Sequence, residues 1–226
     1  MLNTASYPSH PGFTLVELLI ALAIGSVVLT GLLGIFETTV KHSNATLNAV
    51  RLDQDLRTAM DMISGDIRRA GFWGNAKNNI GLGVNNNPFM TTTTDVTINN
   101  AGNCILLSYD KNGDGAIAAL GAGDDERYGY RLSGQVLQAR LPNAAFSCTS
   151  ASTTWEDITN PKIITMTGLS FTKDEKSIDL DNSGAGVAAL ILRSITITLS
   201  GQLATDASVS KTLTQQIKIR NDRFAP

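Results

Sequence analysis

An acidic turn holds side chains of the types that bind a hard cation. Asp110, Asn112 and Asp114 alternate in the stretch DKNGDG, which matches the D-x-N-x-D-G opening of a calcium loop. Position twelve of that loop is Gly121, where an EF-hand has a bidentate glutamate, but the acidic residues 124–126 follow and could complete the shell. Asp, Asn and Gly also favour turns without a metal. A calcium site and a tight polar turn are therefore both open interpretations.

No catalytic constellation accompanies this turn. The two histidines are His10 and His42, and the chain lacks HExxH, GxSxG, P-loop and Rossmann motifs. The stretch 179–184 (DLDNSG) is a weaker second acidic turn. With 18 Lys and Arg against 20 Asp and Glu, the net charge of −2 lacks the basic footprint of a general nucleic-acid binder. We therefore expect no enzyme activity, no nucleic-acid partner, and no cofactor other than calcium.

The two cysteines, Cys104 and Cys148, do not form a CxxC motif. If this part of the chain is exported to an oxidising compartment, a disulfide between them is the natural interpretation. Such a bond would close a loop of about 45 residues, which chain-entropy arithmetic values at roughly 4 kcal/mol. The alternative is a pair of buried, unpaired thiols.

The N-terminal part of the chain contains one long apolar segment. Residues 13–36 read FTLVELLIALAIGSVVLTGLLGIF and carry a single charge, Glu17. From Leu18 to Phe36 the run is uncharged and, as a helix, about 28 Å long, close to the hydrocarbon thickness of a bilayer. A cleaved secretory signal would have a basic start and an A-x-A-like site after the apolar run, and neither is present. The pattern predicts a transmembrane helix.

A helical rhythm continues beyond this segment, over residues 37–71. Apolar residues recur at spacings of 4, 4, 3 and 4 and form a narrow stripe that indicates a core-facing helix surface: Leu52, Leu56, Met60, Ile63 and Ile67. Gly71 is the expected stop. We predict one long helix, with a membrane half at 13–36 and an amphipathic half at 37–71.

The remaining residues, 72–226, predict a β-rich region. A polar loop is expected at 75–88 and a hairpin turn at 131–136. Several of the apolar runs alternate with polar residues, as in half-buried strands; the expected strands are Asp95–Ile98, Cys104–Tyr109, Tyr128–Leu132, Val136–Arg140, Ile163–Phe171, Leu190–Leu199 and Thr212–Arg220. A long helix packed on antiparallel strands gives an α+β fold class.

The junction Gly12-Phe13-Thr14-Leu15-Val16-Glu17 resembles the class III signal of type IV prepilins. The resemblance implies a leader over residues 1–12, cleavage by a prepilin peptidase between Gly12 and Phe13, and N-methylation of the Phe13 amine. It also implies a single-pass inner-membrane protein, with residues 72–226 as a periplasmic head, that later enters a pilus or pseudopilus. The leader departs from the family pattern because it has no Lys or Arg, so charge gives no orientation.

The resemblance implies a role for Glu17 in assembly. A carboxylate at the centre of a bilayer costs about 2.5–3.5 kcal/mol, and less near the interface. Cleavage would place a charged amine at Phe13, one helical turn away, and Glu17 of one subunit could pair with that amine of its neighbour in a filament. The alternative is that Glu17 reaches the lipid headgroups.

A second resemblance lies at the end of the predicted helix. The stretch DIRRAGFWG resembles the D-[IL]-R-x-A-G-[FY]-W-G pattern of PilW-type minor pilins; the matching residues are Asp66, Ile67, Arg68, Ala70, Gly71, Phe72, Trp73 and Gly74. It implies a minor pilin that takes part in initiation and assembly of a type IV pilus, with other minor and major pilins and the inner-membrane assembly platform as partners. A J-type pseudopilin of type II secretion is the alternative. Phe72 and Trp73 are expected to be buried against the head, with surface recognition as the other interpretation.

Overall fold

The computed structural model describes residues 12–79, 86–180 and 189–225. The chain divides into two compact units, Met1–Leu47 and Asn48–Pro226. Within the described residues, one long helix, antiparallel strands and two short 3-10 turns make up the regular structure, so the expected α+β class is confirmed. The leader residues 1–11 and most of the second acidic turn, 181–184, lie outside the described residues.

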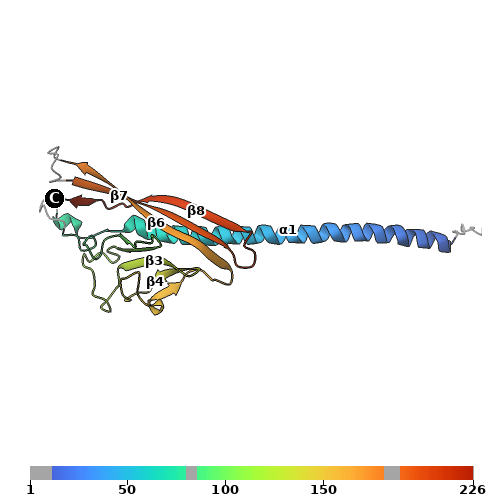
Figure 1. The fold of residues 1–226 in the computed structure, drawn as a ribbon, viewed down its shortest axis with the longest axis horizontal. Coiled ribbons are helices and arrows are strands. Elements are labelled where there is room, and N and C mark those ends of the chain that lie inside the picture. The colour runs from blue at the N-terminus through green and yellow to red at the C-terminus, as the bar shows by residue number, and fades with distance from the viewer. Residues whose placement is uncertain (1–11, 80–85, 181–188, 226) are drawn as a thin grey trace, which may run out of the picture. The chain divides into compact units, whose positions relative to one another are not determined.

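Helix α1 spans Leu15–Arg69 without a break, and so joins the two predicted helical halves (Figure 1). No proline interrupts this stretch, and the helix continues through the glycines at 25, 31 and 34. Glu17 in the first turn and Arg68 and Arg69 in the last turn complement the helix dipole. The helix therefore has favourable charges at both ends.

Gly71 ends the helix two residues after Arg69, close to the predicted stop. Its φ of +72° is a left-handed conformation that favours glycine, as at many helix C-termini. The Gly71 N–H donates to the Ser108 carbonyl at 2.8 Å, and a Cβ here would lie 2.4 Å from Cε of Met90. The backbone conformation therefore favours a glycine at this position, whereas the Met90 methyl group, at the end of a flexible side chain, could move aside.

The first sheet has five antiparallel strands in the order β1-β2-β3-β4-β5. Its strands are β1 (Thr97–Ile98), β2 (Cys104–Ser108), β3 (Arg127–Ser133), β4 (Val136–Arg140) and β5 (Trp155–Asp157). The tight turn between β3 and β4 is the predicted hairpin, and Gly134 adopts φ +60° there. Residues 109–126 connect β2 to β3 and carry the acidic turn.

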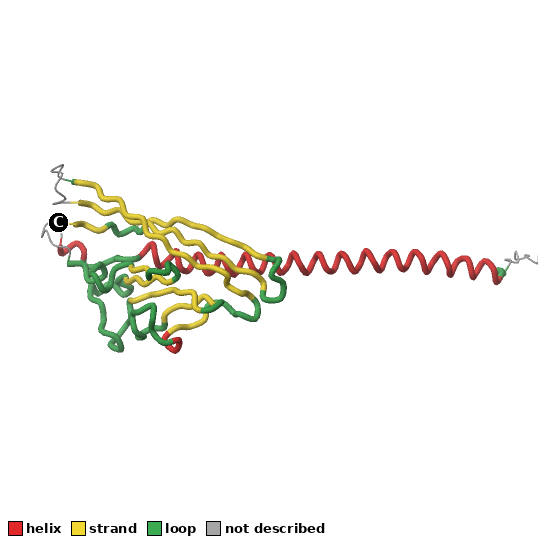
Figure 2. Tube along the Cα trace, viewed as in Figure 1, coloured by secondary structure: helices red, strands yellow, loops and turns green. Residues whose placement is uncertain are grey.

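The second sheet is built on two long strands (Figure 2). β6 (Ile164–Asp179) pairs with β7 (Ala189–Leu203), and β7 also pairs with β8 (Ser210–Lys218) and, at its N-terminal end, with β9 (Arg223–Ala225). Buried side chains alternate along most of β7, as its apolar-polar pattern predicts.

Seven strands were expected and have counterparts, whereas the three-residue strands β5 and β9 were missed. β6 also extends past its expected end at Phe171. Residues 172–179 are all exposed and, apart from Ile178, polar, so no apolar alternation marks them, yet they pair in register with Ala189–Thr196 of β7. Backbone pairing with β7 carries this extension.

The C-terminal part of α1 and both sheets share one hydrophobic core. The predicted stripe is confirmed, because all five of its residues are at most 4% exposed. Full burial of a side chain of this size contributes about 1.5–3 kcal/mol. Leu52 is the first buried residue of α1, and every described side chain before it is exposed or half-buried.

The expected burial of Phe72 against the head is wrong, because this residue is 45% exposed. The backbone at this point pairs with the end of β2: Gly71 donates to Ser108, and the Phe72 carbonyl accepts the Asp110 N–H at 2.9 Å. This extended pairing holds the Phe72 backbone and leaves its ring at the surface. Trp73 is half-buried, and its Nε1 donates to the Gly115 carbonyl at 2.8 Å.

Candidate functional site

The expected cleavage junction lies just outside helix α1. Gly12 and Phe13 precede the helix, and the Phe13 side chain is 89% exposed. Thr14 and Glu17 form a capping box: the Glu17 N–H donates to Thr14 Oγ1 at 3.2 Å, and Glu17 Oε2 accepts the Thr14 N–H at 3.3 Å. Sequence analysis missed this cap, although the T-x-x-E spacing before an apolar run is its known signature.

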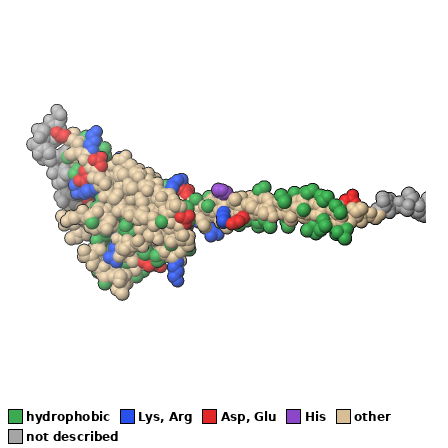
Figure 3. All heavy atoms as spheres, turned by 45° about the vertical axis from the view of Figure 1, so that its right-hand side comes forward, with side chains coloured by type: hydrophobic (Ala, Val, Ile, Leu, Met, Phe, Trp, Pro, Cys, Tyr) green, Lys and Arg blue, Asp and Glu red, His purple; other side chains and the backbone are tan. Residues whose placement is uncertain are grey.

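The segment 13–36 exposes its apolar side chains along its whole described length. An 18-residue window of α1 near the N-terminus has a mean hydropathy of 2.5, and none of that window is buried. Figure 3 shows the hydrophobic side chains gathered on this part of the helix. By length and composition the segment is able to cross a membrane. An apolar surface of this extent marks a site for lipid or for other apolar helices.

Cys104, at the start of β2, and Cys148, between β4 and β5, form a disulfide with a Cα–Cα distance of 6.0 Å. This confirms the expected pairing and leaves no free cysteine. A small buried cluster surrounds the bond, in which Leu106, Trp155 and Phe146 pack together. The disulfide therefore ties the long β4–β5 connection to the first sheet.

Replacing both cysteines by serine is expected to lower the free energy of unfolding by about 2–4 kcal/mol, because the unfolded chain regains the entropy of the open loop. Thermal unfolding of the full chain in detergent, with and without dithiothreitol, measures the effect. The double variant is the control, since reductant should lower the melting temperature of the wild type but not of the variant. Equal melting temperatures for oxidised wild type and variant would show that the bond contributes nothing.

A buried polar cluster, centred on Asp66, lies at the end of α1. Asp66 is 7% exposed and accepts hydrogen bonds from the hydroxyls of Tyr109 at 3.0 Å and Tyr130 at 2.5 Å. Arg69 Nη2 lies 2.7 Å from Asp66 Oδ1. Burial, together with the Asp66 charge, raises the pKa of Tyr130, which therefore stays a hydrogen-bond donor. Sequence reasoning missed this cluster because no local pattern connects residues 66, 109 and 130.

The structure brings the expected acidic turn together directly after β2. The buried Asp110 accepts the Gly113 N–H at 2.6 Å through Oδ1, and the N–H groups of Gly74 at 2.8 Å and Gly115 at 2.9 Å through Oδ2. The Asn112 Oδ1 accepts the N–H of Asp114 at 2.9 Å, and its Nδ2 donates to Asp114 Oδ2 at 2.9 Å. These hydrogen bonds hold the turn in its observed conformation.

Glu126 joins this turn from the residue just before β3. It is 1% exposed, and Oε1 accepts the N–H of Lys111 at 2.7 Å and of Asn112 at 3.4 Å. One carboxylate oxygen each from Asp110, Asp114 and Glu126 lies within 4.8 Å of the others. Burial raises the pKa of Glu126, and the neighbouring charges of Asp110 and Asp114 add to the rise. Of the acidic residues 124–126, only Glu126 reaches the turn.

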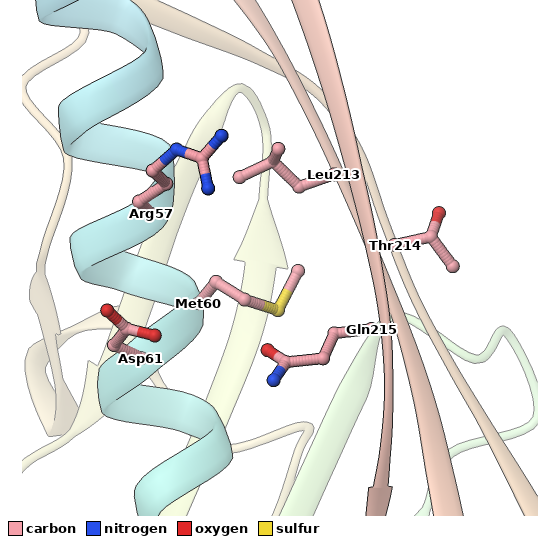
Figure 4. A pocket seen from close by; sticks show the side chains of 6 residues that line it. All are labelled: Arg57, Met60, Asp61, Leu213, Thr214 and Gln215. Atoms are coloured by element: carbon pink, nitrogen blue, oxygen red, sulfur yellow. The ribbon is translucent and has the colours of Figure 1, made fainter.

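A shallow pocket of about 260 Å³ lies between α1 and β8 (Figure 4). Met60 points from the helix toward the strand, and the Thr214 side chain points away from the helix. Six residues line the pocket: Arg57, Met60, Asp61, Leu213, Thr214 and Gln215. None of them is a His, Ser or Cys.

Comparison with known proteins gives two family matches. The model for prepilin peptidase-dependent protein B matches residues 45–219, and the model for the prokaryotic N-terminal methylation motif matches residues 9–33. A protein of Escherichia coli (strain K12), prepilin peptidase-dependent protein B, is 25% identical over 153 residues, which cover 68% of this chain and 72% of that protein. No solved structure gives a significant match.

Proposed function

The chain belongs to the family of prepilin peptidase-dependent protein B and carries a prepilin-type methylation motif at residues 9–33, and on this premise we propose that it is a minor pilin that initiates or assembles a type IV pilus. The observation that carries the proposal is the apolar surface of residues 13–36, which is exposed along its whole length. Lipid covers this surface before assembly, and the N-terminal helices of other pilins cover it afterwards. The function is structural and not catalytic.

We propose that prepilin peptidase cleaves between Gly12 and Phe13 and that the new Phe13 amine is methylated. The N-terminal methylation motif supports this maturation. The position of the junction also supports it, because Gly12 and Phe13 precede α1 and lie at the surface. A peptidase needs such non-helical, accessible backbone.

Glu17 is proposed to pair with the Phe13 amine of a neighbouring subunit. Its carboxylate has no cationic partner within the described chain, since its hydrogen bonds come from the backbone and hydroxyl of Thr14. A carboxylate that enters an apolar helix bundle needs a counter-charge. The processed N-terminus supplies one at the right end of the helix.

The proposed location is the inner membrane, with the β-rich region in the periplasm. The disulfide supports this orientation, because disulfides persist in the periplasm and are rare in the cytosol. The partners are prepilin peptidase, other minor and major pilins, and the inner-membrane assembly platform. A PilW-type role rests on the resemblance of DIRRAGFWG at the end of α1.

The function is tested by deleting the gene in its native host and restoring it on a plasmid. Deletion is expected to remove most surface pili counted by electron microscopy and to leave secretion of exported enzymes unchanged. The restored protein is purified and its N-terminus determined by mass spectrometry. We expect a chain that begins with N-methylated Phe13.

Two outcomes contradict the proposal. If pili remain and enzyme secretion is lost, the chain is a J-type pseudopilin of type II secretion. If the protein recovered from the membrane still carries residues 1–12, or is cut elsewhere, then prepilin processing is wrong and with it the assembly role.

A further inference from the structure

Three carboxylates meet at the acidic turn without a compensating cation. Within the described residues, Asp110, Asp114 and Glu126 form no ion pair with any Lys or Arg, although their oxygens lie within 4.8 Å of one another. Asp125, the residue directly before Glu126, does have cationic partners. Asp125 pairs with Arg140 at 2.7 Å and with Arg127 at 3.3 Å. The fold therefore neutralises one acidic residue here with arginines and leaves the adjacent cluster negative.

Glu126 adds a second observation. Its Oε1 accepts two backbone N–H groups, but Oε2 is buried and has no hydrogen-bond partner. A buried, unpartnered carboxylate oxygen is costly, and native structures leave few such atoms without a partner. This atom belongs to a side chain that is 1% exposed and that faces Asp110 and Asp114.

We propose that Asp110, Asp114 and Glu126 bind one Ca²⁺ ion. Calcium takes six to eight oxygen ligands in flexible geometry, and carboxylates are its usual protein ligands. Magnesium demands near-ideal octahedral geometry and loses its waters reluctantly, so it suits the turn less well. Zinc prefers nitrogen and sulfur, and the cluster contains neither. Asp114 is exposed, so water has access to the remaining coordination positions.

The site differs from an EF-hand in how it closes. Position twelve of the loop is Gly121, and Glu126 takes the place of the missing glutamate from the far end of the β2–β3 connection. The ion would therefore join the turn 110–115 to the start of β3.

Calcium at this position would also fix the chain that leaves α1. Trp73 Nε1 donates to the Gly115 carbonyl at 2.8 Å, the Gly74 N–H to Asp110 at 2.8 Å, and Asn75 Nδ2 to the Asp114 carbonyl at 3.1 Å. All three partners belong to the acidic turn. Ordering of the turn by an ion is therefore transmitted to residues 73–75.

The test uses the full chain in detergent micelles, freed of metal with EDTA and then dialysed. Thermal unfolding is followed with and without CaCl2, and calorimetric titration gives the stoichiometry. At a hundredfold excess over the dissociation constant, calcium is expected to raise the melting temperature by about 5–10 °C with one site per chain. Equal concentrations of MgCl2 should give a much smaller shift.

Glu126→Gln is the informative variant, because its amide oxygen keeps the two backbone hydrogen bonds and its amide nitrogen can donate to Asp110 or Asp114. We expect it to melt at or above the wild-type temperature in EDTA and to lose the calcium shift. Asp124→Asn is the matched control, since Asp124 is exposed in the same connection and lies outside the cluster, so its calcium shift should stay intact.

The proposal is overturned if the wild type shows neither heat of binding nor a melting shift at 10 mM CaCl2, a concentration on the order of ten times the weakest usual calcium sites. It is equally overturned if Glu126→Gln keeps the full shift, or if magnesium matches calcium. Should Glu126→Gln fail to fold, Asp114→Asn replaces it, because the exposed Asp114 is not needed for the core.

Discussion

Replacing Glu17 by alanine is expected to leave the protein in the membrane fraction but to reduce its amount in sheared filaments at least tenfold. The membrane segment keeps its length and becomes more apolar, so insertion is retained. In the filament, however, the Phe13 amine of the neighbour would be left without its counter-charge. Removing one partner of a buried ion pair costs about 3–5 kcal/mol, which exceeds a tenfold change in equilibrium. Quantitative immunoblots of sheared filaments and membranes measure the ratio.

The capping box complicates this test, because alanine removes both the charge of Glu17 and its hydrogen bonds with Thr14. Glu17→Gln separates the two roles, since Gln also serves at this position of a capping box but carries no charge. We expect Glu17→Gln to be as poorly incorporated as Glu17→Ala. Incorporation of the Gln variant at wild-type levels would show that Glu17 is needed only to cap the helix.

Replacing Arg140 by methionine is expected to lower the free energy of unfolding by about 3–5 kcal/mol, because Asp125 would stay buried without its main partner. Both side chains are at most 1% exposed, and Arg140 Nη1 lies 2.7 Å from Asp125 Oδ2. Arg140 also donates to the carbonyls of Arg127, Ala144 and Ala145, and so holds the chain that follows β4. Thermal or urea unfolding of the full chain in detergent measures the loss.

The double variant Arg140→Met with Asp125→Asn is the control, because it removes the stranded charge. It should recover part of the lost stability; if it is as unstable as Arg140→Met alone, the carbonyl contacts of Arg140 matter and not the ion pair.

The same ion pair predicts a pH dependence. Burial favours a higher pKa for Asp125, but the hydrogen bond from Arg140 and the Asn143 N–H outweigh burial and hold this pKa below its ordinary value. The unfolded value is about 3.9, so the stabilisation is complete above it and is lost as the pH falls through the lower folded pKa. Asp125→Asn should lack this part of the acid-induced loss.

Local patterns sufficed for the elements whose signal lies within a few residues. The continuous apolar run predicts the exposed membrane segment, and the spacing of Leu52, Leu56, Met60, Ile63 and Ile67 predicts the buried stripe, because helix periodicity places these side chains on one face. Most strands were found for the same reason. The pairing of Cys104 with Cys148 needed only that the chain has two cysteines.

Features that depend on tertiary pairing were beyond such reasoning. Asp66 meets Tyr109 and Tyr130 only because α1 packs against the end of β2 and the middle of β3. The sequence placed Asp124, Asp125 and Glu126 near the acidic turn but gave no means of choosing among them, and packing selects Glu126. Phe72 was expected to be buried on its apolar character alone, whereas backbone pairing with Asp110 decides its exposure.

The position of Leu52 as the first buried side chain of α1 has a practical consequence for crystallography. A shortened chain that starts at Asn48 would keep every side chain that the helix contributes to the interior, together with the disulfide and the acidic turn. It would lack the exposed apolar residues 13–36, which are the reason for using detergent. The exposed apolar run at 13–36 and the buried stripe that starts at Leu52 therefore occupy separate stretches of one continuous helix.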